Sequence, residues 1–252
     1  MHKTLFKLAF AALALLLNCG AMAQSTKYVQ KFREFESLLK TRIERWNKNE
    51  NADEFNKNLT ADIFSILNAV EIAPEWEFIV DLPDEELIFP GDDSELYLHN
   101  KNNDKKINYY LTHIKLKNVS EDSFWHWFIL ARVFIHMLPA SGHFAYGSID
   151  YILTEEDLQN NLRYVYVVPD NDFDGFGMSE TNFKKLKNMK IEPVTVNVDK
   201  SNKKAEFVIY TWNDWVGLIE DHYRIAMKDD NTAEVENIDS KTIVEYDCGI
   251  RY

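Results

Sequence analysis

Three aspartates at alternate positions carry the clearest chemical signal in the sequence. Asp170, Asp172 and Asp174 are followed at once by Gly175. In a tight loop this spacing lets alternate carboxylates converge, and carboxylate oxygens are the ligands that a hard cation such as Ca²⁺ prefers. The glycine permits the sharp bend that such a loop needs. The pattern therefore predicts a calcium site formed by these three aspartates.

The second half of this segment departs from the calcium-loop pattern. Its first six positions resemble an EF-hand loop, which continues with an apolar position 8 and a bidentate Glu at position 12. Here position 8 is Gly177 and position 12 is Thr181, while Glu180 lies one place early. The other interpretation is a polar turn after a strand, in which an aspartate caps the next helix. Both interpretations stay open, and a structural ion fits this loop better than a regulatory switch.

A second group of candidate residues lies in the most apolar stretch of the chain, residues 120–139. His126, Arg132 and His136 are its only strongly polar side chains between positions 124 and 138. On an α-helical wheel they fall within about a third of the circumference. In one interpretation this strip lines a pocket. In the other, which we favour, the three side chains satisfy hydrogen bonds in the core or extend their charged ends to water.

Signatures of familiar catalytic sites are missing from the sequence. It has no HExxH, no GxSxG, no glycine-rich phosphate loop and no Cys/His cluster. Acidic residues are so frequent that a carboxylate pair neither supports nor excludes glycosidase-type chemistry. Trp212 and Trp215 flank Asn213-Asp214, and an exposed pair could stack on a sugar or a partner, although burial in the core is the interpretation we favour. The sequence therefore names no catalytic residue.

The stretch 120–139 itself is expected to be a buried helix around which the rest of the chain packs. Ser120 is a suitable N-cap, and Glu121 and Asp122 follow it where the helix dipole favours acidic side chains. The segment is too short and too polar to span a bilayer, which takes about 20 apolar residues. Pro139 ends it.

The remaining segments predict an α+β fold with an N-terminal helical hairpin, a buried central helix and a mostly antiparallel sheet that ends in a β-meander. Apolar residues recur every three or four positions in the two hairpin helices. The acidic segment 81–95 is expected to be a loop, which is either solvated or an acidic contact surface for a basic partner. Residues 163–168 are apolar on both faces and predict a central, covered strand. The expected helices are 26–46, 53–69 and 181–189, and residues 155–161 are expected to form a short acidic helix or a turn. The expected strands are 75–80, 96–99, 107–116, 163–168, 194–198, 206–211, 225–227, 234–238 and 242–246.

The first 23 residues have the three parts of a secretory signal. Positive residues come first, the apolar run 8–17 follows, and Ala21-Met22-Ala23 forms a small-x-small cleavage site. This predicts a signal peptide at 1–23 and a single domain at 24–252, exported to the periplasm or secreted. A competing interpretation makes Cys19 a lipidated N-terminus, although Asn18 before it fits a lipobox poorly. Cleavage after Ala23 would leave Cys248 as the one cysteine, so no internal disulfide is expected.

Charge narrows the range of partners. Removal of the signal leaves 26 basic and 41 acidic residues, a net charge of −15. Such a surface repels nucleic acid and anionic lipid, and suits a cation or a basic protein. Later segments are too polar to span a membrane.

Two functional hypotheses follow from these observations. The first is an exported, acidic, protein-binding module, such as an inhibitor or immunity-type antagonist of a basic partner. The second is an exported hydrolase with an acidic and histidine-containing site, stabilised by calcium. We favour the non-enzymatic hypothesis because catalytic motifs are missing.

Overall fold

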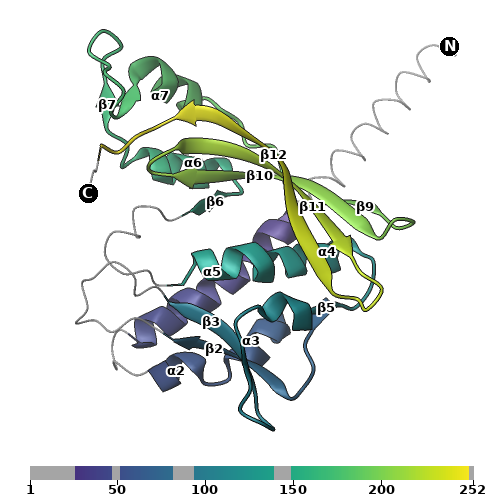
Figure 1. Ribbon diagram of the computed structural model, residues 1–252. Coiled ribbons are helices and arrows are strands. Elements are labelled where there is room, and N and C mark those ends of the chain that lie inside the picture. Colours follow the sequence, from purple (N-terminus) through teal and green to yellow (C-terminus); the bar gives the residue numbers. More distant parts are fainter. Residues whose placement is uncertain (1–25, 47–51, 82–93, 139–148, 250–252) are drawn as a thin grey trace, which may run out of the picture.

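A long, twisted antiparallel sheet runs through the molecule, with helices packed on both of its faces (Figure 1). The computed structural model describes residues 26–46, 52–81, 94–138 and 149–249. The α+β class and the C-terminal meander predicted from the sequence are confirmed. The predicted signal peptide, Cys19 and most of the acidic segment 81–95 lie outside the described residues. Within the described part, no helix has the length and apolarity needed to cross a membrane.

The sheet has the strand order β12-β11-β10-β6, and β9 also pairs with β10. Every pairing in it is antiparallel. Neighbouring residues of β10 point to opposite faces, so Ile209 belongs to the larger core and Tyr210 to a second, smaller one. The strands are β6 (Asp150–Ile152), β9 (Asn197–Asp199), β10 (Lys204–Asn213), β11 (Gly217–Met227) and β12 (Ala233–Glu245).

The C-terminal strands are longer than the sequence predicted. Three short strands were expected after position 224, whereas β11 and β12 form one long hairpin. Polar residues interrupt the alternation of apolar and polar side chains by which a strand is recognised in the sequence. In the sheet these polar side chains are accommodated by hydrogen bonds across the strands. The carboxylate of buried Asp221 accepts hydrogen bonds from Thr211 Oγ1 (3.0 Å), Asn237 Nδ2 (2.9 Å) and Ser240 Oγ (2.6 Å). Since β12 is an edge strand, most of its side chains remain exposed.

The central helix forms as predicted, with an irregularity in its middle. It consists of α4 (Glu121–Phe128), a π-helical turn (Ile129–Val133) and α5 (Phe134–His136). Ser120 caps it by accepting a hydrogen bond from the backbone N–H of Ser123 at 3.3 Å. The aromatic side chains of α4 are buried, and Phe128 packs against Phe207 of β10 with ring centroids 4.8 Å apart. This helix therefore fills the space between the long sheet and the N-terminal elements.

The N-terminal half differs from the prediction at two places. The second helix is divided into α2 (Ala52–Asn56) and α3 (Leu59–Ile66), because Asn58 adopts a left-handed conformation with φ of 58°. The strand expected at 107–116 is replaced by short pieces, since its middle turns into a 3₁₀ helix that buries Tyr110. These pieces are β4 (Lys106–Ile107), η1 (Tyr110–His113) and β5 (Lys115–Leu116); β5 pairs with β1 (Val70–Glu71), and β4 extends a sheet of β2 (Trp76–Asp81) and β3 (Glu95–Asn100).

A small lobe packs on the other face of the long sheet. Its helix α6 begins with a capping box between Thr154 and Asp157. The strand expected at 163–168 is wrong in extent and in position. Only its last two residues form a strand, and Tyr164 and Tyr166 are 87 % and 67 % exposed, because this segment pairs with one short neighbour at the periphery. The lobe consists of α6 (Glu155–Leu162), β7 (Val167–Val168), β8 (Met178–Ser179) and α7 (Glu180–Lys187).

Candidate functional site

His126, the first of the three polar residues in the central helix, holds a backbone segment in place. It is 2 % exposed, and its Nδ1 accepts a hydrogen bond from the backbone N–H of Ala69 at 3.1 Å. Ser123 Oγ donates to the carbonyl of the same Ala69 at 3.0 Å. Burial lowers the pKa of His126 to about 4, so the ring is neutral at pH 7. These contacts fix the segment before β1 to α4.

Arg132 and His136 lie in different surroundings from His126. The guanidinium of Arg132 lies 5.6 Å from the ring centroid of Tyr223, and its buried Nε has no hydrogen-bond partner within the described part. His136 Nδ1 lies 2.8 Å from the hydroxyl oxygen of Tyr151. A π-turn holds more residues than an α-turn and rotates the positions that follow it. The three residues therefore do not form the single strip that an α-helical wheel suggests.

Two buried tyrosines compensate for the π-turn. The wider turn frees carbonyls from regular α-helical bonding, and buried carbonyls need another donor. The Tyr110 hydroxyl donates to the Leu130 carbonyl at 2.9 Å, and the Tyr151 hydroxyl donates to the Arg132 carbonyl at 3.1 Å. Since the Tyr151 proton is used there, His136 Nδ1–H donates to the Tyr151 oxygen. Burial raises the pKa of both tyrosines, so both hydroxyls stay protonated.

A pocket of about 420 Å³ opens beside this network. The helix at 26–46, the end of α5, β6 and α6 form its walls. Of the three polar residues in the central helix, His136 lines this pocket, together with Tyr151. Burial and the positive charge of Arg132 lower the pKa of His136. The other polar side chains that line the pocket are Arg33, Glu36, Lys40, Asp150, Asp157, Asn160 and Asn161.

The aspartate-rich loop lies between β7 and β8 of the small lobe. Asp170 accepts hydrogen bonds from Thr181 N (3.0 Å) and Thr181 Oγ1 (2.7 Å), which lowers its pKa. Asp174 Oδ1 accepts from the backbone N–H of Phe176 at 3.2 Å, and Asp172 Oδ1 accepts from Asn171 Nδ2 at 3.1 Å. Among the described residues, no group of three or more His, Cys, Asp or Glu side chains is placed to hold a metal ion. Calcium binding at this loop stays a prediction.

Exposed aromatic side chains gather around the same loop, on what we call the tip surface. It consists of five side chains, all at least 37 % exposed: Tyr166, Phe173, Phe176, Trp215 and Val216. Phe173, Trp215 and Val216 line one cavity of about 290 Å³. Tyr166 lies against Gly177 of the same cavity, where an added Cβ would be 2.9 Å from its ring. Half of the ten exposed large hydrophobic side chains in the described part therefore lie on this one surface.

Carboxylates border the tip surface. Asp172 and Asp174 are exposed on the loop, and Glu245 and Asp247 line the cavity beside Trp215. Among the described residues that line this cavity there is no lysine or arginine. The tip surface thus combines aromatic area with negative charge.

Comparison of the chain with protein-family models, curated proteins and solved structures found no match. The interpretation of both sites therefore depends on their chemistry alone.

Sequence reasoning identified parts of each site but did not assemble either one. Trp215 was noted, and the structure leaves it 37 % exposed while burying Trp212 to 2 %. Tyr164 and Tyr166 were assigned to a covered strand, although alternating tyrosines in an otherwise apolar run are a sign of a half-exposed segment. Tyr151 and Asp150 carried no local signal, because their neighbours in the pocket come from distant segments.

Proposed function

We propose that this protein is an exported, non-catalytic binding module that holds a basic partner protein at the tip surface. An inhibitor or immunity-type antagonist of a basic protein has this character. The observation that carries the proposal is the gathering of Phe173, Trp215 and their aromatic neighbours among carboxylates. Large exposed apolar patches with polar rims mark interaction sites, and aromatic residues dominate the binding energy of protein interfaces.

Charge supports the choice of a basic partner. The full chain has a net charge of −13, and four of the carboxylates lie around the tip surface. Complementary charge raises the rate of association and makes it sensitive to salt. The aromatic side chains would supply the buried centre of the interface, and the carboxylates its polar rim.

The test is affinity capture from a native extract of the source organism at about 50 mM and about 500 mM salt, two conditions that differ strongly in charge screening. We expect a basic protein to be retained at low salt and released at high salt. The double variant Phe173→Ala/Trp215→Ala should retain at least about tenfold less of it. Tyr109→Ala is the matched control, since Tyr109 is 70 % exposed and belongs to the N-terminal part. Equal retention by both variants, or no salt-sensitive partner, would reject the proposal.

An exported hydrolase remains the second candidate, and the pocket beside α5 favours it. That pocket places His136 with the carboxylates of Glu36 and Asp150. Burial and the neighbouring carboxylates raise the pKa of Asp150, while burial lowers that of His136. Opposite shifts of this kind suit an acid and a base that act together. Loss of a detected hydrolytic activity in both His136→Gln and Asp150→Asn, with Phe173→Ala unaffected, would support this candidate.

A further inference from the structure

The pocket beside α5 is lined by both apolar and polar side chains. Phe32, Leu39 and Ile43 come from one face of the helix at 26–46, and Met137 and Ile149 extend that surface. The same helix also supplies Arg33, Glu36 and Lys40, and further polar groups come from Asn160 and Asn161 of α6 and Asp150 of β6. A volume of about 420 Å³ lies within the range of sites that enclose small organic molecules. This arrangement suits a ligand with an apolar body and a polar end.

Three of the charged side chains in the pocket already bind each other. Arg33 Nη1 donates to Glu36 at 2.8 Å, and Arg33 Nη2 donates to Asp157. Asp157 Oδ2 also accepts from the backbone N–H groups of Leu153 and Thr154, at 3.0 and 2.9 Å. The positive charge of Arg33 is therefore shared between two carboxylates, and both are committed to the protein.

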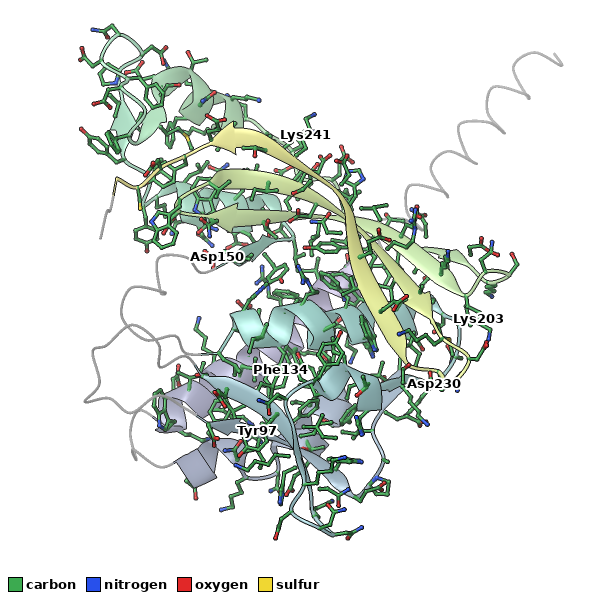
Figure 2. The ribbon with its side chains drawn as sticks, in the orientation of Figure 1. Tyr97, Phe134, Asp150, Lys203, Asp230 and Lys241 are labelled. Carbon is green, nitrogen blue, oxygen red and sulfur yellow. The ribbon has the colours of Figure 1, made fainter. Side chains whose placement is uncertain are left out.

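Asp150 is the carboxylate that these bonds leave available. Its carboxylate has no hydrogen bond or ion pair with another described residue. It lies on β6, the edge strand of the long sheet (Figure 2), and it lines the pocket. Burial and the nearby carboxylates of Asp214, Glu36 and Asp157 raise its pKa. A carboxylate in such a negative environment gains most from a bound cation.

We propose that this pocket binds a small organic molecule that carries a primary ammonium group on an apolar body, with the ammonium at Asp150. The apolar body would lie against the helix at 26–46. The side-chain amide oxygens of Asn160 and Asn161 would accept further hydrogen bonds from the ammonium. Charge-assisted hydrogen bonds of this kind are stronger than neutral ones. This inference goes beyond the protein-binding function and needs no catalytic step.

A pair of matched probes tests the ligand class. 2-Phenylethylamine and 3-phenylpropionate have similar apolar bodies and opposite charges at pH 7. Binding of each to the full chain is followed by NMR titration. We expect millimolar or tighter binding of the amine, with shifts at residues around Asp150, and at least about tenfold weaker binding of the propionate.

Variants locate the site and separate it from general electrostatic attraction. Asp150→Asn should weaken amine binding about tenfold. Asp229→Asn removes an exposed carboxylate in the turn between β11 and β12 and should leave binding unchanged. Asn160→Trp should abolish binding by filling the pocket, with the melting temperature as a check on folding. Failure of the amine to bind, equal binding of the propionate, or equal loss in Asp150→Asn and Asp229→Asn would overturn the proposal. None of these outcomes bears on capture at the tip surface, which the variants do not touch.

Discussion

On one face of the long sheet the aromatic side chains are buried around the central helix, whereas beside the small lobe a second set reaches the surface. Phe128 and Trp125 are fully buried and pack against Phe207 of the sheet. Phe173 and Trp215, by contrast, are 41 % and 37 % exposed. Residues of the same strand, β10, contribute to both cores. The difference shows that aromatic content by itself does not separate packing from recognition.

The polar side chains also differ between the region around the central helix and the region beside the small lobe. Around the central helix, His126, Tyr110 and Tyr151 satisfy backbone groups of Ala69, Leu130 and Arg132. In the small lobe, the carboxylates of Asp172 and Asp174 stay at the surface beside aromatic rings. Of the three polar residues in the central helix, His126 thus holds the backbone of Ala69, whereas His136 lines the pocket beside α5.

A matched pair of aromatic deletions gives the largest expected contrast between the two regions. Phe128→Ala should lower the free energy of unfolding by about 3–5 kcal/mol, because it removes a fully buried ring and leaves a cavity. Phe173→Ala should change the free energy of unfolding by less than about 0.5 kcal/mol, because its ring is largely in water. Urea denaturation of both variants measures this. Similar losses in the two would mean that the tip surface is part of the core.

The pH dependence of stability tests the buried state of His126. Its pKa is about 4 in the folded protein and about 6.5 when unfolded, so the unfolded state takes up the proton first as the pH falls. The stabilisation is present above pH 6.5 and is lost between pH 6.5 and 4, by about 3 kcal/mol in total.

The control for this prediction is His126→Asn, whose amide oxygen can accept the bond from Ala69 N without titrating. As the pH is lowered from 6.5 to 4, the urea concentration at the midpoint of unfolding should fall less steeply in this variant than in the wild type. Parallel curves for the two proteins would show that the ring is not buried as a neutral acceptor.

Calcium tests whether the loop beside the tip surface is more than a turn. If Asp170, Asp172 and Asp174 bind the ion, calcium at 100 times its dissociation constant stabilises the fold by about 2.7 kcal/mol. For a domain of this size the melting temperature should then rise by about 5–10 °C relative to EDTA. The Asp172→Asn variant should lose this rise. An equal melting temperature in calcium and EDTA would leave the loop as a hydrogen-bonded turn.

A helix cap tests whether the two regions fold as one unit, as the prediction of a single domain at 24–252 requires. Thr154 caps α6 by accepting a bond from Asp157 N at 3.2 Å, so Thr154→Ala should cost about 1 kcal/mol. Because the two cores share β10 and β11, we expect the whole protein to lose this stability together.

Hydrogen exchange distinguishes this outcome from independent folding of the lobe. In Thr154→Ala, the protection of the slowest-exchanging backbone amides against hydrogen exchange should fall equally in α4 and in β10. A loss confined to amides of α6 and α7 would show that the small lobe opens alone.

The sequence by itself determined the features that depend on neighbouring residues. The apolar periodicity of residues 26–46 and the cap at Ser120 are local patterns, and the structure confirms the helices they predicted. The α+β class followed in the same way, because it needs only the kinds and order of the elements.

Only the tertiary structure decided which side chains meet and which reach water. The π-turn separated His126 from Arg132 and His136, and the pocket joined His136 to Asp150 and to a helix about a hundred residues earlier in the chain. The segment around Tyr166 resembled a covered strand, yet it lies at the periphery, where it pairs with one short strand. Exposure is set by the packing of segments distant in the chain, and local periodicity does not encode that packing.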